Sequence, residues 1–291
     1  MKILRCMKNA VLLPSGMTDR IVLLVLFAAL LHASWNALLR SGDDKLWSMT
    51  MMCVAVAGCS ALIACVLPMP ATESWPYAVL SAVLHVGYNL FLVRSYEAGD
   101  LGRIYPIARG SSPILITVGA VVFAGEALSW LTAAGVLVIS LGIIGLAHGR
   151  HHLSSTGLRS ALGTGGFIAA YSVTDGMGVR LAAQPMAYTA WMCVMWGVLM
   201  PLVYMSRRGA LSLFAPRPGR CTALMGGIIS LVAYGLVIYA MQVAPMGAVS
   251  ALRETSVLFA ALIGYVFLGE SLSLQKCAAC VVITTGIFIV G

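Results

Sequence analysis

Long runs of apolar residues dominate this chain and restrict the environments in which it can fold. A helix needs about 20 mostly apolar residues to cross the ~30 Å hydrocarbon layer of a membrane. The apolar runs, and the Gly, Pro and charged residues that end them, give ten predicted spans. These lie near residues 21–39, 46–67, 76–97, 103–124, 129–147, 158–181, 187–205, 220–242, 246–268 and 273–290. Very short connections, such as residues 97–100 and 243–246, predict antiparallel hairpins and leave no loop long enough for a soluble domain.

The composition excludes several classes of protein. Of 291 residues, 60% are hydrophobic and 10% are charged, whereas a soluble domain is about half apolar and about a quarter charged. Too little polar surface exists to cover a soluble enzyme, and the chain is too apolar to be disordered. The net charge of +8 comes from 18 Lys and Arg without a basic cluster, so no nucleic acid is expected as a partner. We predict a multi-pass protein of a cell membrane (the inner membrane, in a bacterium) with the lipid bilayer as its solvent.

No motif for a cofactor or for catalysis is recognised. The eight cysteines fall almost entirely within apolar runs, where Cys packs as a small hydrophobic residue. The group formed by His148, His151 and His152 lies on a predicted loop without a neighbouring thiolate or carboxylate. The chain has no G-x-x-x-x-G-K-[ST], H-E-x-x-H or G-x-S-x-G pattern. We therefore expect no metal, nucleotide or prosthetic group, and no enzymatic activity.

The chain contains an internal repeat at an offset of 144 residues. Phe123-Ala-Gly-Glu126-Ala-Leu-Ser129 aligns with Phe267-Leu-Gly-Glu270-Ser-Leu-Ser273, and Arg109 aligns with Arg253. Over the aligned segments 105–147 and 249–291, 13 of 43 pairs are identical. Five spans per half is an odd number, so the second half must enter the membrane in the opposite orientation. Such inverted repeats form the two interconvertible faces of many secondary transporters, with a substrate site near the midplane.

The predicted fold class is thus an all-α integral membrane protein of ten transmembrane helices in two inverted five-helix repeats. The domain division is an N-terminal segment (1–20), a first repeat (21–147), a linker loop (148–157) and a second repeat (158–291). The apolar stretch from Ile21 has no small-residue cleavage site after it and is interpreted as an uncleaved first helix. Met1 and Met17 are both candidate start sites.

The chain resembles the EamA family of the drug/metabolite transporter superfamily over roughly residues 21–291. The resemblance depends on Ser34-Trp35-Asn36 in the first span and on Gly125-Glu126-x-Leu128 and Gly269-Glu270-x-Leu272 after the fourth and ninth spans. It implies a carrier, commonly an exporter of amino acids or other metabolites. It also implies a central cavity lined by spans one to four and six to nine, with spans five and ten at the periphery.

Polar residues inside the predicted spans are the candidate binding residues. An ionisable side chain at mid-bilayer costs roughly 2.5–3.5 kcal/mol on the insertion scale, so its presence indicates a function or a partner. Several of these residues recur at i, i+4 spacing, which puts them on one helix face. The ten candidates are His32, Asn36, His85, Asn89, Tyr105, Arg109, Tyr171, Asp175, Arg253 and Glu254.

Structural roles are the alternative for many polar residues. Arg40, Arg94, Arg103 and Arg180 lie near span ends, where a long side chain reaches the interface. Glu126 and Glu270 are expected, by the family resemblance, to cap or brace helix ends. Tyr and Trp near span ends are typical of an interfacial belt. Arg253 has two candidate structural partners, Glu254 and Asp175.

A guanidinium group suits a carboxylate or phosphate. The hypothesis is therefore a secondary-active carrier of a small anionic or zwitterionic metabolite such as an amino acid. The acid group of the metabolite would bind Arg109 or Arg253, and the ammonium group of a zwitterion would bind Asp175 or Glu254. The alternatives are efflux of multiple drugs or cationic compounds, and a non-transporting membrane accessory protein. Proton coupling through His32, His85, Asp175 or Glu254 is a further open alternative.

The sequence leaves two features open, the orientation in the membrane and the oligomeric state. The Lys and Arg count favours termini outside the cell, whereas the family resemblance implies termini inside; ten spans would place both termini on one side. A single chain holds both repeats, so a monomer suffices, and Gly145-x-x-x-Gly149 is a weak signal for a homodimer.

Overall fold

The computed structural model is a bundle of helices, and it describes residues 17–97, 101–147, 155–212, 217–268 and 273–290. The helices in the first half are α2 (Asp19–Ser41), α3 (Lys45–Val66), the 3-10 turn η1 (Thr72–Ser74), α4 (Trp75–Glu97), α5 (Leu101–Ala124) and α6 (Trp130–Gly145). Those in the second half are α7 (Ser155–Leu181), α8 (Pro185–Arg208), α9 (Arg220–Val243), α10 (Met246–Glu254), α11 (Ser256–Leu268) and α12 (Leu274–Val290). The described residues form no β-strand, so the predicted all-α class is confirmed.

Every predicted span is helical, with bounds that differ by a few residues. Within the part of the chain that the structure describes, seven helical segments are long and apolar enough to cross a membrane. Helices α6 and α12 are apolar but shorter, with 16 and 17 residues, and α7 has 27 residues but a more polar sequence. The chain is thus a multi-pass helical membrane protein, and the count of ten spans stays a prediction.

The ninth predicted span differs from expectation, because it is two helices rather than one. Helix α10 ends at Glu254 and α11 begins at Ser256. Between them, the backbone N–H of Thr255 bonds to the carbonyls of Leu252 and Arg253. The Thr255 hydroxyl also donates to the Leu252 carbonyl, at 2.6 Å. Such local bonds compete with the regular helical pattern, and they interrupt the span directly after the ionisable pair Arg253-Glu254.

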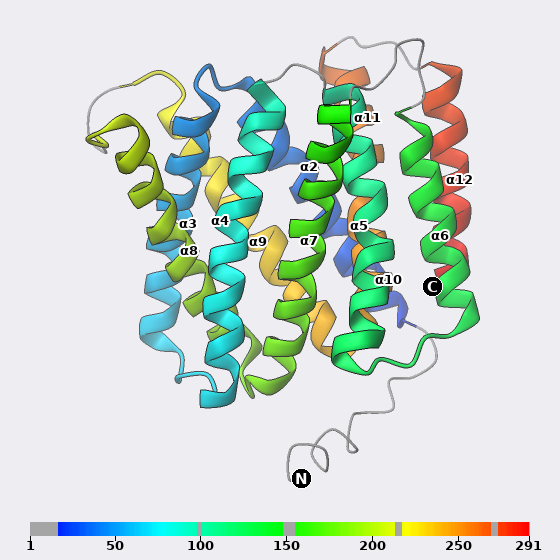
Figure 1. The fold of residues 1–291 in the computed structure, drawn as a ribbon, viewed down its shortest axis with the longest axis horizontal. Coiled ribbons are helices and arrows are strands. Elements are labelled where there is room, and N and C mark those ends of the chain that lie inside the picture. The colour runs from blue at the N-terminus through cyan, green and yellow to red at the C-terminus, as the bar shows by residue number, and fades with distance from the viewer. Residues whose placement is uncertain (1–16, 98–100, 148–154, 213–216, 269–272, 291) are drawn as a thin grey trace.

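The helices alternate in direction and pack in pairs that join the two halves of the chain. In Figure 1 the start of α2 and the end of α12 both lie at the lower end of the bundle. Helix α3 packs against α8, α6 against α12, α2 against α9, and α4 against α7. A two-fold exchange of the halves would convert α2·α9 into α7·α4 and leave the other two pairs unchanged. The packing therefore agrees with an inverted repeat, which stays a prediction.

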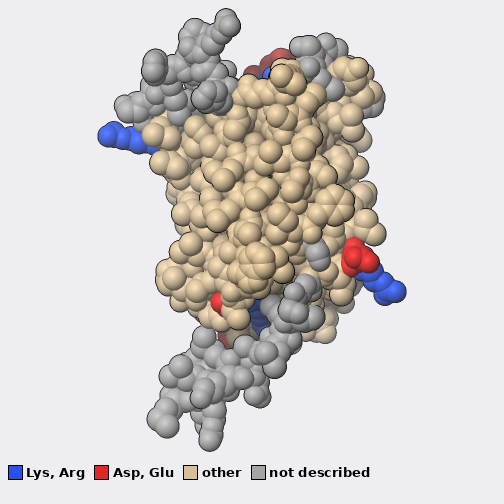
Figure 2. Space-filling model, turned by 90° about the vertical axis from the view of Figure 1, so that its right-hand side faces the viewer, with Lys and Arg blue, Asp and Glu red and all other residues tan. Residues whose placement is uncertain are grey.

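The outer surface fits a lipid environment. Figure 2 shows a broad uncharged belt, with charged side chains only toward the upper and lower ends of that face. Large apolar side chains are exposed on the outward faces of the helices, among them Leu62, Phe123, Trp130, Leu274 and Phe288. Apolar surface of this extent is typical of contact with lipid.

Helices α6 and α12 lie together at one edge of the bundle (Figure 1). They pack backbone against backbone at two glycines. A Cβ added to Gly135 would lie 3.1 Å from the Gly286 carbonyl oxygen, and a Cβ added to Gly286 would lie 3.1 Å from the Gly135 carbonyl oxygen. Small residues are common where transmembrane helices approach this closely.

Candidate functional site

A buried ion cluster of two arginines and one glutamate lies between α5 and α10. The Arg109 Nη1 donates to Glu254 Oε2 at 2.9 Å, and the Arg253 Nη2 donates to Glu254 Oε1 at 2.8 Å. The side chains are 2%, 1% and 0% exposed for Arg109, Arg253 and Glu254. One carboxylate therefore balances two guanidinium groups, and the cluster carries one excess positive charge.

Arg109 is held on several sides. Besides Glu254, its guanidinium contacts the His32 Nε2 and donates to the Tyr88 hydroxyl at 3.3 Å. It also lies over the Tyr105 ring, 4.9 Å from the ring centroid. These contacts use most of the donors of the guanidinium, so Arg109 is well placed to hold α2, α4, α5 and α10 together.

Proline in α5 affects the backbone at Arg109. Pro113 has no N–H to donate to the carbonyl four residues earlier, which is that of Arg109. The Ser112 hydroxyl donates to this carbonyl instead, at 3.2 Å. In a membrane every backbone polar group needs a partner within the protein, so Ser112 compensates locally for the proline and keeps the segment around Arg109 helical.

The two arginines are equivalent in the 144-residue repeat, yet they meet on the same carboxylate. In the predicted inverted repeat, equivalent residues can meet only near the axis that would relate the two halves. The residue equivalent to Glu254 is Gly110, which packs against α6: an added Cβ there would lie 2.8 Å from the Ser140 carbonyl oxygen. Position 110 therefore has no room for a second carboxylate, and the cluster keeps two positive charges against one negative charge.

A small cavity of about 40 Å³ adjoins the cluster on the side of Arg253. Its lining is His32, Trp35, Met49, Met52, Cys53, Val56, His85, Tyr88, Asn89, Tyr171, Trp196, Ser230, Tyr234 and Arg253. A water molecule needs about 10–15 Å³ of such volume, so the cavity has room for roughly three. This conformation is too closed for a metabolite of amino-acid size.

Aromatic rings surround His85 on the cavity wall. The ring centroid of His85 lies 4.0 Å from that of Tyr171, 5.1 Å from that of Tyr234 and 5.6 Å from that of Trp196. The rings of Tyr171 and Tyr88 also meet, at 5.5 Å. The cavity thus has a cationic end at Arg253 and an aromatic wall around His85.

Asp175 forms a second polar group behind this wall. Its carboxylate is fully buried and accepts hydrogen bonds from the hydroxyls of Tyr188, at 2.9 Å, and Tyr234. Among the described residues, no Lys or Arg forms an ion pair with Asp175. Of the two partners predicted for Arg253, Glu254 is therefore the one observed.

The remaining candidates lie near the cavity in more local roles. The Asn36 amide donates to the His32 carbonyl at 2.8 Å, one turn earlier in α2. The Asn89 amide lines the cavity and contacts the Cys53 Sγ at 3.6 Å. Tyr105 is half-buried under Arg109. The structure thus gathers all ten sequence candidates around one region, five of them on the cavity wall: His32, His85, Asn89, Tyr171 and Arg253.

Of the charged residues predicted to have structural roles, some form ion pairs between helices and others are exposed near helix ends. Arg180 pairs with Glu126 and donates to the carbonyls of Met241 and Ala244. The Glu126 carboxylate also accepts the N–H of Met246, at 3.2 Å, so it braces the start of α10 as expected. Arg40 and Arg94 are exposed near helix ends. His148, His151, His152, Gly149 and Glu270 lie outside the described residues, as does the side chain of Arg103.

Sequence reasoning missed Tyr88, Trp196 and Tyr234. Each lies well inside its helix rather than at a membrane interface, which is the signal that could have separated it from the interfacial belt. Their placement depends on tertiary packing, because α4, α8 and α9 bring them to one wall only in the folded bundle.

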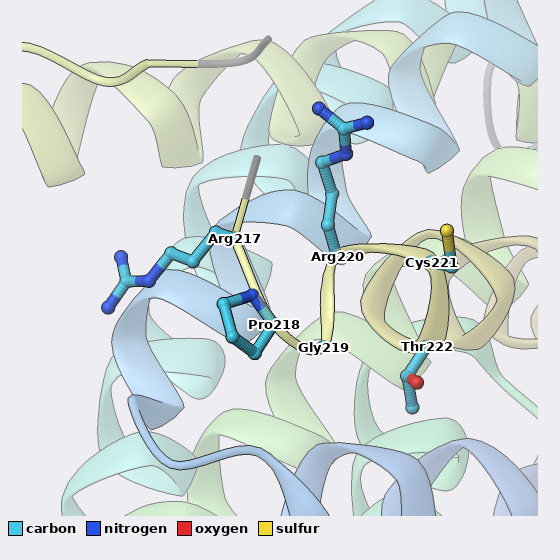
Figure 3. Close-up of a pocket in the computed structure, with 6 residues that line it drawn as sticks. All are labelled: Arg217, Pro218, Gly219, Arg220, Cys221 and Thr222. Carbon is cyan, nitrogen blue, oxygen red and sulfur yellow. The ribbon is translucent and has the colours of Figure 1, made fainter. Parts of the chain in front are cut away.

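A larger surface hollow of about 380 Å³ occurs at the start of α9. Figure 3 shows that a single continuous segment lines it, residues 217–222, with the side chains of Arg217 and Arg220 pointing apart. Arg217 pairs with Asp44 at 3.2 Å and lies 4.4 Å over the Trp47 ring. This open hollow has no converging polar groups and is separate from the buried cluster. The described residues contain no group of three or more His, Cys, Asp or Glu that could hold a metal ion.

Comparison with known proteins shows what the second half of the chain is similar to. Residues 155–291 match the sequence profile of the EamA-like transporter family. This half of the chain is thus similar to EamA-like transporters. The matched range includes α7 to α12, and with them Asp175, Arg253 and Glu254 of the site.

A similarity of fold to a solved structure extends over nearly the whole chain. A solved structure described as "Crystal structure of protein" superposes on this chain with a TM-score of 0.73. The superposition covers 94% of this chain and 96% of the other chain. Its sequence is 18% identical, so the likeness shows the fold alone. No curated protein sequence matches the chain. The family match over residues 155–291 and the membrane-span helices together support a multi-pass membrane transporter.

Proposed function

We propose that this EamA-like protein is a secondary-active carrier for a small anionic or zwitterionic metabolite such as an amino acid, and that it works as an exporter. The observation that carries the proposal is the excess positive charge of the Arg109–Glu254–Arg253 cluster next to a cavity. A desolvated, uncompensated guanidinium is costly, and an anionic group bound beside it relieves that cost.

Arg253 is the anchor for the acid group in this proposal. It lines the cavity and, among the side chains that the structure describes, donates hydrogen bonds only to Glu254. Arg109 is absent from the cavity lining and is engaged by His32, Tyr88 and Glu254. The two arginines, which the sequence left equivalent, are therefore assigned separate roles: Arg253 binds the substrate and Arg109 holds the helices.

Alternating access supplies the transport step. The ion pair between Arg109 and Glu254 joins the two halves of the chain, and the closed cavity lies between helices of both halves. Rocking of one half against the other would open this cavity to one side of the membrane at a time.

The test is a ligand-induced thermal shift on purified protein in detergent, because a ligand that binds only the folded state raises its stability. The probes are glutamate (anionic), serine (zwitterionic), glycerol (neutral) and tetraphenylphosphonium (cationic). We expect stabilisation by glutamate or serine that is lost in Arg253→Ala and kept in the matched exposed control Arg94→Ala. Stabilisation by glutamate or serine that survives in Arg253→Ala would refute the assignment of Arg253.

One observation favours a second function, the efflux of cationic compounds. Tyr171, Tyr234 and Trp196 line the cavity, and the faces of aromatic rings attract cations. In that case tetraphenylphosphonium alone would stabilise the protein, and Asp175→Asn rather than Arg253→Ala would abolish its effect.

A further inference from the structure

One buried ionisable group, Asp175 in the C-terminal half of α7, is not used by the anion site. Its carboxylate is 0% exposed. Glu254, the other fully buried carboxylate of the site, has two arginine partners, whereas the hydrogen-bond partners of Asp175 among the described residues are hydroxyl groups. An ionised carboxylate without a cation is costly in an apolar interior, and hydroxyl donors repay only part of that cost. Protonation removes the charge, and a protonated carboxyl group can donate a hydrogen bond to one of the same hydroxyls.

Two polar routes connect Asp175 to the cavity. Tyr234 lines the cavity and donates its hydroxyl directly to Asp175 Oδ2. His85 also lines the cavity, and its Nδ1 contacts the Ser81 hydroxyl at 3.1 Å. The Ser81 side chain also lies close to the Asp175 carboxylate. Both routes consist of groups that donate and accept, as proton transfer requires.

We propose that Asp175 is the proton-binding group of this transporter and exchanges its proton with the central cavity through Tyr234 and through Ser81 and His85. Tyr234 passes its hydroxyl proton to the carboxylate and takes one proton from the cavity, so the net change is one proton bound to Asp175. The proposal rests on the carrier function above, because a proton site on the cavity wall gives a carrier its coupling ion.

Among the described residues, the groups around Asp175 are titratable hydroxyl, thiol and imidazole groups, and no Lys or Arg pairs with it. Titratable groups reach it from α8, with Tyr188 and Cys193, from α9, with Tyr234, and from α4, with His85 through Ser81. On its own helix Tyr171 lies one turn earlier. The charged residues of α5 and α10 (Arg109, Arg253 and Glu254) pair with one another. No described cation competes with the proton for this carboxylate.

Infrared difference spectroscopy tests the proposal without a substrate. A protonated carboxyl group has a C=O stretching band separate from the amide bands, and this band disappears when the group ionises. We expect the purified protein to show such a band that titrates between mildly acidic and mildly alkaline pH. The band should be missing in Asp175→Asn and unchanged in Glu126→Gln, which removes a described carboxylate paired with Arg180.

A second variant keeps the test decisive if Asp175→Asn does not fold. Tyr234→Phe keeps the carboxyl group but removes one hydroxyl partner, so the band should move to higher frequency. A titrating band that is unaltered in Asp175→Asn or in Tyr234→Phe, or the absence of any titrating band, would overturn the proposal. The readout needs no bound metabolite, so failure of the glutamate and serine shifts would count against the carrier's substrate class and leave this result independent.

Discussion

Removing the shared carboxylate of the ion cluster should destabilise the protein more than any other single charge change in the described core. Glu254→Gln leaves two guanidinium groups, 2% and 1% exposed, next to each other without a counter-charge. Removing one partner of a buried pair typically costs about 3–5 kcal/mol, and here one removal breaks two pairs. We therefore expect a loss of about 3–5 kcal/mol in the free energy of unfolding. Glu126→Gln is the matched control with a smaller expected loss, because its partner Arg180 is 24% exposed.

A double-mutant cycle shows whether the charge is the cause. Arg109→Met on its own leaves the neutral pair of Arg253 and Glu254, and added to Glu254→Gln it removes one of the two uncompensated charges. The double variant should therefore lose about 1–3 kcal/mol less than the sum of the single variants. Equilibrium unfolding of the purified protein in mixed micelles, titrated with denaturing detergent, measures each corner of the cycle. Additivity within about 0.5 kcal/mol would refute the argument, since Arg109 and Glu254 would then not interact energetically.

Two further predictions concern packing and orientation. Gly135→Ala should destabilise the protein, because the added Cβ would lie 2.3 Å from the Val290 Cγ2 and 3.0 Å from the Val290 nitrogen. The control is Gly58→Ala in α3, where an added Cβ has nothing within 4 Å, and it should be neutral or stabilising by about 0.5–1 kcal/mol. Equal shifts in the melting temperature of the two variants would contradict this prediction. The upper end in Figure 1 carries most of the described Lys and Arg and should face the cytoplasm. A membrane-impermeant maleimide added to intact cells should then fail to label a variant whose single cysteine is the exposed Cys221. It should label a variant whose single cysteine is introduced by Thr72→Cys. The reverse labelling pattern would place the termini inside the cell.

The sequence predicted the helices well because the bilayer leaves few alternatives. A spanning segment must satisfy its own backbone hydrogen bonds, so each long apolar run is a helix and each polar interruption is an end. The same argument could not find the break at Thr255. Threonine is tolerated within helices, and the run from Met246 to Leu268 stays apolar enough to be one span. At the break the hydroxyl and the backbone N–H of Thr255 both bond to the Leu252 carbonyl, a local arrangement that hydropathy does not report.

The sequence predicted which residues form the candidate site, but it did not predict which of them contact one another. Spacing within a helix identified Arg109 and Asp175 as inward-facing groups, and the repeat identified Arg253. Which acid neutralises which base is decided between helices: Arg109 and Glu254 are 145 positions apart in the chain. Asp175 could not be assigned tyrosine partners from sequence, because Tyr188 and Tyr234 lie on other helices.

The asymmetry of the cluster has a consequence for the proposed motion. Arg253 and Glu254 are neighbours on α10 and move together, whereas Arg109 belongs to the other half of the chain. If the halves rock as proposed, the ion pair that must stretch is the one between Arg109 and Glu254. Opening the cavity then exposes Arg109 as a second guanidinium without a full counter-charge, and the anionic group of a bound metabolite can supply it. The pair that holds the closed state would thereby also favour opening when an anion is present, which connects substrate binding to the conformational change.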